Sequence, residues 1–429
     1  MPRNFIKNIR NNEFIGNVLT LFSGSVIAHL VPLAVLPVIT RLYNPDIIGV
    51  FFLYSSTAFI ISGFSTLRYD LAVVLPKRDK DAWNLLTVGI FVVLIMGFLF
   101  FFITFLLDEE ITALLDTSLI KNWLLLIPVS VILLGITQLF IYWNNRKKNY
   151  KLISIVKILK TSTIGITQIV LGLLHFTKSG LIAGLVTGQF IATAFISVKG
   201  LISNRKKIHE VSWVKSRYLI KKYKNMPIYN SFIAVINTFA NHLPIFLLTA
   251  FYNVHEAALY GLADKIISTP MGLTGQSIAH VFYQKASEYY NEKKNIHEFV
   301  KKMYRSLAKM AVLPFAAAAV ASPLLFKYIF GMTYENSGYI VLILIPWLFV
   351  RFLNIPPTML INVLNKQKIL LLYNIFMLLF RILALYAGYF LYNDVFISLI
   401  LYSFTGLVFS LLLMFYILNL SKKFSRQAP

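Results

Sequence analysis

Four ionisable side chains lie within long apolar stretches in the second half of the sequence, namely Asp264, Lys265, Arg351 and Arg381. An ionisable group at the depth of a lipid bilayer costs about 2.5–3.5 kcal/mol or more, so each residue is a functional candidate. Three cations against one carboxylate leave an excess of positive charge, which favours an anionic ligand. Phosphate is the best candidate, because arginine offers two parallel N–H donors and lysine a compact point charge.

Asp264 and Lys265 are neighbours in the sequence, so on a helix their side chains point about 100° apart and cannot share one face. We expect Asp264 to pair with Arg351 or Arg381, or to hold a coupling ion, and Lys265 to face a cavity. The alternative is that these charges form structural pairs only, or extend to the membrane surface along their aliphatic stems. The distance from mid-span is too great for that extension, which favours a ligand-binding role for the group.

A lipid carrier joined to a glycan through pyrophosphate fits such a site, with the phosphates on the three cations and the glycan on polar groups nearby. Asn237, Asn241 and His242 offer such groups in the seventh apolar segment, although hydrogen bonding between helices explains them equally well. Two arginines at segment ends are further candidates. Arg41 is predicted near the outer surface. Arg68 opens the first inner loop, where it would either meet an incoming anion or only orient the chain.

Several catalytic motifs are absent from the sequence. There is no cysteine, which excludes disulfides, thiol catalysis and cysteine metal sites, and the seven histidines form no HxxxH or HExxH pattern. No GxxxxGK[ST] motif occurs, so direct ATP coupling within this chain is not expected. The DKD string at residues 79–81 lies in a short basic loop, with no domain around it to hold a nucleotide sugar. We therefore expect neither a bound cofactor or metal nor an enzymatic activity.

The composition is that of an integral membrane protein. Hydrophobic residues make up 58% of the 429 and charged residues 14%, against about 25% charged residues in a typical soluble domain. Apolar segments long enough to cross a bilayer recur along the whole chain. The predicted transmembrane helices span residues 15–41, 45–67, 83–107, 120–143, 152–174, 180–203, 227–251, 255–281, 306–330, 338–362, 368–392 and 395–419. The predicted fold class is all-α integral membrane, with twelve transmembrane helices in two six-helix lobes.

The distribution of basic residues predicts the orientation of the chain. The net charge is +24, with 41 Lys and Arg against 17 Asp and Glu. Most of the Lys and Arg fall in segments 1–13, 68–82, 144–160, 199–226, 285–309, 366–368 and the tail after 419. Inner loops of membrane proteins collect such residues, so both termini are predicted to be cytoplasmic. Because topology explains the basic charge, nucleic acid is not expected as a partner.

The two halves carry six predicted spans each. We assign an N-terminal lobe to residues 1–204, a basic cytoplasmic connector to 205–226 and a C-terminal lobe to 227–429. A shift of 209 residues aligns YNPDIIG, from Tyr43, with YNVHEAA, from Tyr252, which indicates parallel repeats related by an axis along the membrane normal. Two such bundles suit alternating access around a central site, and the connector is predicted to lie along the inner leaflet.

Five segments along the chain carry a family likeness. They are LPVITRLYNPDIIGVF (36–51), RYDLAVVLPKRDKDAWNL (68–85), ALYGLADKIISTP (258–270), HVFYQKASE (280–288) and LLFKYIFGMTYENSGYIVLILIPW (324–347). The second resembles the R-Y/F-D/E-x-A-x-x-L-P-K pattern of the polysaccharide biosynthesis transporters. Together the segments resemble this family, the Wzx-type O-antigen flippases of the MOP superfamily.

The resemblance implies a MATE-like fold of twelve helices in the cytoplasmic (inner) membrane of a bacterium. It implies export of an undecaprenyl-pyrophosphate-linked oligosaccharide from the inner to the outer leaflet, for O-antigen or another surface polysaccharide. An H+ or Na+ gradient is the implied energy source. The implied partners are membrane lipid, a glycan polymerase and a chain-length regulator. Basic residues in the central cavity of family members agree with the surplus of cations noted above.

Three other classes of protein compete with this expectation. A MATE-type multidrug exporter would hold cations, and so predicts acidic residues in the cavity, whereas this interior has three cations and one acid. A membrane glycan polymerase or ligase often carries a large external loop, and the outer loops here are all short. A lipid II flippase usually has two additional C-terminal spans.

Overall fold

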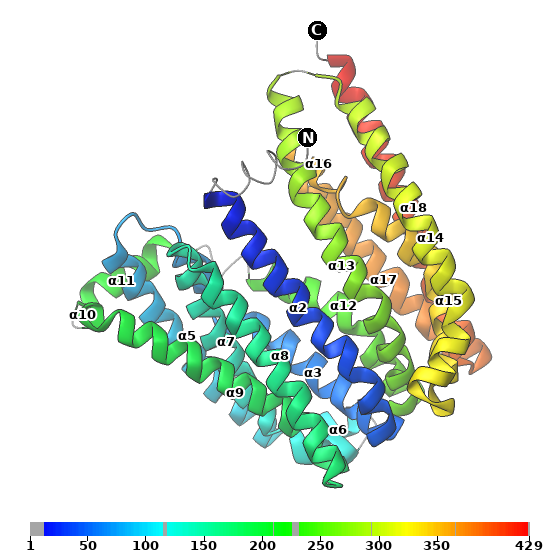
Figure 1. Ribbon diagram of the computed structural model, residues 1–429, viewed down its shortest axis with the longest axis horizontal. Coiled ribbons are helices and arrows are strands. Elements are labelled where there is room, and N and C mark those ends of the chain that lie inside the picture. Colours follow the sequence, from blue (N-terminus) through cyan, green and yellow to red (C-terminus); the bar gives the residue numbers. More distant parts are fainter. Residues whose placement is uncertain are drawn as a thin grey trace. The chain divides into compact units, whose positions relative to one another are not determined.

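The computed structural model describes residues 13–114, 118–208, 210–224, 231–292, 294–364 and 366–427, and every regular element in these ranges is a helix (Figure 1). The chain forms two compact units, of which the first ends at Phe246 and the second begins at Leu247. The boundary falls inside helix α12 (Ser231–Phe251). The lobe and connector limits given above stay predictions.

The first unit contains long helices and short ones. The long helices are α2 (Glu13–Leu42), α3 (Pro45–Ser65), α5 (Asp79–Leu106), α7 (Leu126–Arg146), α8 (Tyr150–Leu173) and α9 (Thr177–Ser203). The short ones are α4 (Tyr69–Ala72), α6 (Asp108–Leu114), the 3-10 helix η1 (Ser118–Trp123), α10 (Arg205–Ile208) and α11 (Trp213–Lys222). Among them α8 packs along both α2 and α9.

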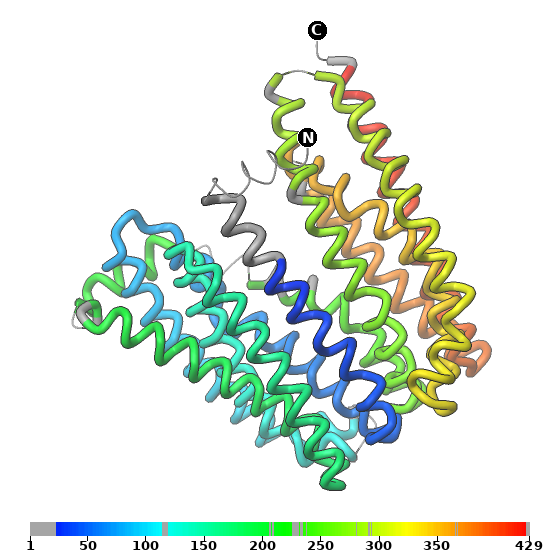
Figure 2. The backbone as a smooth tube through the Cα atoms, in the orientation of Figure 1, coloured from blue at the N-terminus to red at the C-terminus, as the bar shows by residue number. Residues whose placement is uncertain are grey.

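The second unit is built in the same way from long helices joined by short ones. Its elements are α13 (Val254–Asn291), α14 (Ile296–Leu325), the π-helix η3 (Phe326–Phe330), the 3-10 helix η4 (Met332–Tyr334), α15 (Glu335–Asn354), α16 (Met359–Val363), α17 (Gln367–Tyr392) and α18 (Val395–Gln427). Figure 2 shows α14 and α18 running side by side, and α18 also packs against α15 and α17.

Each predicted span overlaps one long helix of the described ranges, and the span 338–362 also covers the short helix α16. Ten of these helices are long and apolar enough to cross a membrane. The other two are α12, whose apolar part Thr238–Phe251 is shorter, and α13, in which polar residues such as Asp264 and Lys265 interrupt the apolar sequence. The all-α membrane fold is confirmed. The least apolar of the long helices is the one that carries two of the candidate charges.

The helix ends differ from the predicted ends where the chain leaves the apolar segments. Helix α13 continues to Asn291 and α14 begins at Ile296, because backbone hydrogen bonds within a helix need no apolar side chains. Helix α15 ends at Asn354, since Pro356 and Pro357 lack the N–H groups that would continue its backbone hydrogen bonds. The predicted span 338–362 is therefore two helices, α15 and α16.

The two Tyr-Asn turns that the sequence aligns have the same local structure. Asn44 caps α3, where its side-chain oxygen accepts a hydrogen bond of 3.1 Å from the backbone N–H of Ile47. Asn253 caps α13 in the same way, with a bond of 2.9 Å from Glu256. A capping asparagine satisfies one of the free N–H groups at a helix start. The weak sequence repeat therefore marks equivalent helix starts in the two units.

The tyrosine before each capping asparagine forms a hydrogen bond to a distant backbone carbonyl group of its own unit. The hydroxyl of Tyr43 donates a hydrogen bond of 2.6 Å to the carbonyl oxygen of Gln168 on α8. The hydroxyl of Tyr252 donates one of 2.9 Å to the carbonyl oxygen of Asp394, directly before α18. The repeat thus extends from the turns to their tertiary contacts.

Part of the predicted connector is packed onto the first unit. Trp83 and Trp143 are both buried and meet edge to face, with ring centres 4.8 Å apart. Leu219 of α11 joins the same apolar cluster. Asn84 on α5 accepts a hydrogen bond of 3.3 Å from the hydroxyl of Ser216 on α11. Helix α11 is therefore held to α5 by apolar and polar contacts.

Helices α8 and α9 approach closely along three glycines of α9, Gly180, Gly184 and Gly188, which are spaced four residues apart. Small residues at this spacing let two membrane helices pack backbone to backbone. A Cβ atom at Gly188 would lie 2.8 Å from the backbone oxygen of Lys160, and one at Gly184 would lie 3.1 Å from the backbone nitrogen of Gln168. Backbone atoms cannot rotate away, so larger residues would separate the helices.

We expect Gly188→Leu to lower the free energy of unfolding by about 1–3 kcal/mol, because the added side chain overlaps the backbone of α8. Gly272 on α13 is the matched control, since a Cβ atom there meets nothing within 4 Å. Unfolding of the purified protein in detergent measures both variants. An equal loss for Gly188→Leu and Gly272→Leu would contradict the close approach of α8 and α9.

Candidate functional site

The side chain of Arg381 is buried in the second unit between two aromatic rings from other helices. Arg381 lies on α17 and is 6% exposed. Its guanidinium carbon lies 4.1 Å from the ring centre of Trp347 on α15 and 4.7 Å from that of Tyr402 on α18. The two rings meet edge to face at 5.4 Å. We call Trp347, Arg351, Arg381 and Tyr402 the arginine–tryptophan cluster.

Arg351 approaches the same indole ring as Arg381. It follows Trp347 by one helical turn on α15, so both side chains lie on one face of the helix. Its guanidinium carbon is 5.3 Å from the ring centre. A cation over an indole face gains about 0.5–2 kcal/mol, which here offsets part of the repulsion between two like charges. Two of the predicted phosphate ligands are therefore brought together by a tryptophan that the sequence analysis did not single out.

Gly406 makes room for the cluster. It follows Tyr402 by one turn on α18, and a Cβ atom there would lie 2.8 Å from Nε1 of Trp347 and 2.5 Å from Nη2 of Arg381. A larger residue would displace the indole or the guanidinium group. Sequence reasoning that searches for polar groups misses such a position, because the glycine contributes by having no side chain.

The guanidinium group of Arg381 keeps hydrogen-bond donors unused. Its Nε and Nη2 atoms are buried and have no hydrogen-bond partner in the described protein. The ion pairs of the described second unit, Lys294–Glu292 and Lys327–Glu335, involve neither Arg351 nor Arg381. A buried charged donor without a partner costs several kcal/mol, more than the aromatic contacts return. Such donors suit a ligand that carries anionic oxygen atoms.

Asp264 forms no ion pair with either arginine among the residues that the structure describes. Its Oδ1 atom accepts a hydrogen bond of 2.6 Å from Ser268, one turn later on α13. Tyr260, one turn earlier, is buried, and its ring meets that of Tyr402 edge to face with ring centres 6.3 Å apart, so α13 meets the cluster through this tyrosine. Lys265 is half-buried on the same helix and has partners of its own. The carboxylate thus stays close to the cluster without neutralising it.

Arg41 and Arg68 belong to the first unit, where they lie at the ends of different helices. Arg41 is exposed in the last turn of α2. Arg68 follows Leu67, and both have left-handed backbone, with φ of 59° and 44°. The Nε atom of Arg68 is buried without a hydrogen-bond partner. Nearby, the hydroxyl of Thr66 donates a hydrogen bond of 2.8 Å to the buried carboxylate of Asp70. Arg68 therefore sits in a strained turn rather than in an ordinary surface loop.

The polar residues of α12 have different surroundings. The ring of His242 hydrogen-bonds to the hydroxyl of Ser56 at 2.9 Å and stacks on Phe59, both on α3. This contact between helices is the second of the two roles expected for His242. Asn241 is exposed and also has a partner. The side chain of Asn237 lies outside the described residues.

Two intramembrane lysines of the first unit were missed by the sequence analysis. Lys157 and Lys160 lie two and three turns inside α8, whereas the charge count placed them in an inner loop. They are three residues apart and share one helix face. The ammonium group of Lys157 donates a hydrogen bond of 3.0 Å to the hydroxyl of Ser25 on α2. The predicted fifth span, 152–174, contains both lysines, but the inner segment 144–160 overlaps it, so both were counted as loop charges.

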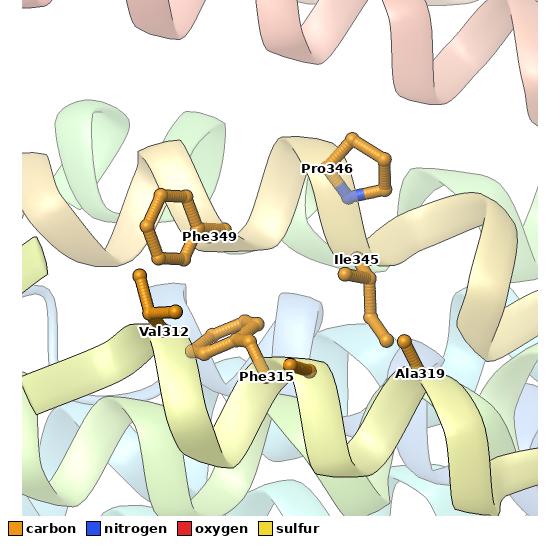
Figure 3. A pocket seen from close by; sticks show the side chains of 7 residues that line it. Val312, Phe315, Ala319, Ile345, Pro346 and Phe349 are labelled. Carbon is orange, nitrogen blue, oxygen red and sulfur yellow. The ribbon is translucent and has the colours of Figure 1, made fainter.

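An apolar pocket of about 270 Å³ lies beside the cluster's helix α15, between α15 and α14, but it does not suit a phosphate or a glycan. Figure 3 shows side chains that line it from the two helices. The lining residues are Val312, Phe315, Ala316, Ala319, Ile345, Pro346 and Phe349. With no polar side chain among them, the pocket offers no ligand for a charged group.

The long apolar helices define a multi-pass membrane protein, and Arg381 is a buried cation within one of its spans. Several solved structures have the same fold. The chain is similar to an inward-facing multidrug resistance MATE family transporter of the MOP superfamily (12% identity, TM-score 0.69, 96% of each chain). It is also similar to the lipid II flippase MurJ in an inward closed conformation. The identity is 13%, the TM-score is 0.72, and the match covers 95% of this chain and 90% of that one. A third similar structure is that of a MOP superfamily transporter from Pyrococcus furiosus. The identity is 11%, the TM-score is 0.60, and the match covers 95% of this chain and 94% of that one.

A family model described as polysaccharide biosynthesis protein matches residues 70–338, which is more than half of the chain. The chain therefore belongs to the polysaccharide biosynthesis protein family, and the resemblance drawn from its sequence segments is confirmed. No curated protein matches the sequence. The matched range includes α13 and the start of α15, and thus Asp264 and Lys265.

We expect Trp347→Leu to lower the free energy of unfolding by about 2–4 kcal/mol, because it removes a buried ring and the cation contacts of two arginines. Tyr402→Phe is the matched control. It keeps the ring face over Arg381, so its loss should stay near 1 kcal/mol. Equilibrium unfolding in mixed micelles compares the variants. If Trp347→Leu is as stable as Tyr402→Phe, the indole does not hold the arginines in place.

Proposed function

We propose that this protein is a flippase that moves an undecaprenyl-pyrophosphate-linked oligosaccharide from the cytoplasmic to the outer leaflet by alternating access. The product would serve the synthesis of O-antigen or another surface polysaccharide. The observation that carries the proposal is the buried guanidinium group of Arg381, with two unpaired nitrogen atoms next to a second arginine. Membership of the polysaccharide biosynthesis protein family supports the same class of substrate.

The pyrophosphate of the carrier would bind the arginine–tryptophan cluster. Its non-bridging oxygens can accept paired hydrogen bonds from guanidinium groups, and the charge would compensate Arg351 and Arg381 at once. Lys265 on α13 would add a third positive charge. The isoprenoid chain would remain in the lipid, where no protein pocket is required.

A MATE-type exporter of cationic compounds is the other function that the fold allows. Binding of cations would need uncompensated carboxylates, but the described cluster has two arginines and its neighbour Asp264 is a single acid. In the Pyrococcus furiosus transporter of this superfamily, a binding pocket of reverse polarity likewise suggests a different function. Charge therefore favours an anionic substrate here.

The gradient that drives transport would be coupled through Asp264, whose carboxylate could bind H+ or Na+ near the cluster. The protein would act in the bacterial cytoplasmic membrane with both termini in the cytoplasm, as the basic segments predict. A glycan polymerase and a chain-length regulator would use the transported unit on the outer side.

We expect Arg351→Ala and Arg381→Ala each to weaken binding of the lipid-linked oligosaccharide by about 10- to 100-fold, because hydrogen bonds to charged groups contribute about 1.5–3 kcal/mol. Arg305→Ala is the matched control, an exposed arginine of the same unit on α14. Affinity is measured in detergent, and surface glycan is measured in cells that depend on the variant.

Normal affinity and normal glycan display in both cluster variants would exclude the proposed phosphate site. Binding of a cationic dye without binding of the lipid pyrophosphate would instead favour the exporter. A loss in Arg305→Ala equal to that in Arg381→Ala would assign the effect to overall charge.

We expect Asp264→Asn to abolish acceleration of flipping by an ion gradient while the affinity for substrate changes less than about threefold. The amide keeps the size of the carboxyl group but cannot exchange a proton or hold Na+ as a carboxylate does. Flipping is measured in proteoliposomes with an H+ gradient, a Na+ gradient or neither. If either gradient still accelerates the variant as much as the unchanged protein, coupling does not run through Asp264.

A further inference from the structure

A pocket of about 960 Å³ lies in the first unit, where α7 ends, α8 begins and α9 ends. Four lysines line it, namely Lys147, Lys151, Lys199 and Lys207. The proposed pyrophosphate site in the second unit uses none of them. Because three membrane helices end around it, the pocket lies at the level of the membrane surface. We call it the lysine pocket.

The charge of the lysine pocket is only partly neutralised. Asp79, at the start of α5, forms an ion pair with Lys147 and another, of 3.3 Å, with Lys207. The same carboxylate also pairs with a neighbouring arginine. No carboxylate of the described residues pairs with Lys151 or Lys199, and both are exposed. One shared carboxylate against four lysines leaves a net positive pocket.

Two of the ammonium groups are held in place by the pocket wall. Lys207 donates a hydrogen bond of 3.0 Å to the side-chain oxygen of Asn204 and lies 4.9 Å from the ring centre of Trp143. Lys147 lies 5.6 Å from the same ring centre. The ring is buried, so these contacts orient the cations before any ligand arrives. Lysines that only orient a membrane chain need no such arrangement.

Apolar side chains stand beside the lysines on two walls of the pocket, α8 and α9. Leu152 and Ile155 on α8 and Ile202 on α9 line it together with the lysines. Ile155 lies one turn further into α8 than Lys151, on the same helix face. Ile155 is 40% exposed and Ile202 is 54% exposed. On α9 the order is reversed, since Ile202 lies nearer the helix end than Lys199. A ligand of the pocket therefore meets cations and exposed hydrocarbon side by side, with the apolar side chain deeper on α8.

We propose that the lysine pocket binds the phosphate headgroup of an anionic phospholipid from the leaflet at the basic end of the first unit. The ammonium groups would bind the phosphate oxygens, and an acyl chain would lie along Ile155, one turn deeper in α8 than Lys151. Basic pockets between membrane helices bind anionic lipid headgroups in this way. A soluble anion would use the lysines but not the exposed isoleucines, which favours the lipid.

The test uses the full chain and native mass spectrometry with phosphatidylglycerol, phosphatidylcholine or inorganic phosphate. The double variant Lys151→Gln/Lys199→Gln should bind phosphatidylglycerol about 30-fold more weakly, at about fivefold for each lysine near the surface. Phosphatidylcholine, with no net charge, should bind at least tenfold more weakly than phosphatidylglycerol. The matched control is Lys221→Gln/Lys224→Gln, which removes the same charge from the first unit outside the pocket and should change binding less than about threefold.

Three results would overturn the proposal. Equal losses in the two double variants would show that the attraction is general and not located in the pocket. Equal binding of phosphatidylcholine and phosphatidylglycerol would show that the headgroup charge is not recognised. Displacement of phosphatidylglycerol by millimolar inorganic phosphate would assign the pocket to a soluble anion. Substrate binding at the arginine–tryptophan cluster is measured separately, so failure of either proposal leaves the other standing.

Discussion

The second unit is organised around the guanidinium group of Arg381, which has aromatic neighbours and, among the residues that the structure describes, no ion-pair partner. Burial of Arg381 requires α15, α17 and α18 to bring an indole, a cation and a phenol to one point, and Gly406 leaves the space for it. Cation–π contacts offset only part of the cost of unpaired N–H donors in the membrane interior. The remaining cost would fall if an anion bound there, and this is the physical basis of the proposed anionic substrate.

Charge within the membrane is not confined to that cluster. Lys157 and Lys160 lie inside α8 of the first unit, where Lys157 is bonded to Ser25. The two units thus hold their cations differently, against aromatic rings in the second and beside a hydroxyl in the first. Since the same tyrosine and capping asparagine stand before α3 and α13, the repeat preserves these helix starts while the charged positions differ.

The basic residues of this chain serve more than one physical purpose. Most follow the alternation of loops that orients a membrane protein, which needs only a net charge at one side. Others have defined partners, as Lys207 does in Asn204, Asp79 and the ring of Trp143. A lysine with such contacts is placed well enough to recognise a headgroup, and composition alone does not separate it from its neighbours.

Hydropathy alone determined the number, order and approximate ends of the twelve helices, because the length of a membrane span is set by bilayer thickness. The cost of a charge in lipid likewise marked Arg351 and Arg381 as candidates from their positions in the sequence. Only the tertiary structure decided that both arginines face Trp347, that Gly406 gives them room, and that Asp264 bonds Ser268 and neither arginine. Those outcomes depend on how helices far apart in the sequence pack. The spacing of residues along one helix shows which of them share a face, but it does not show which other helix that face contacts.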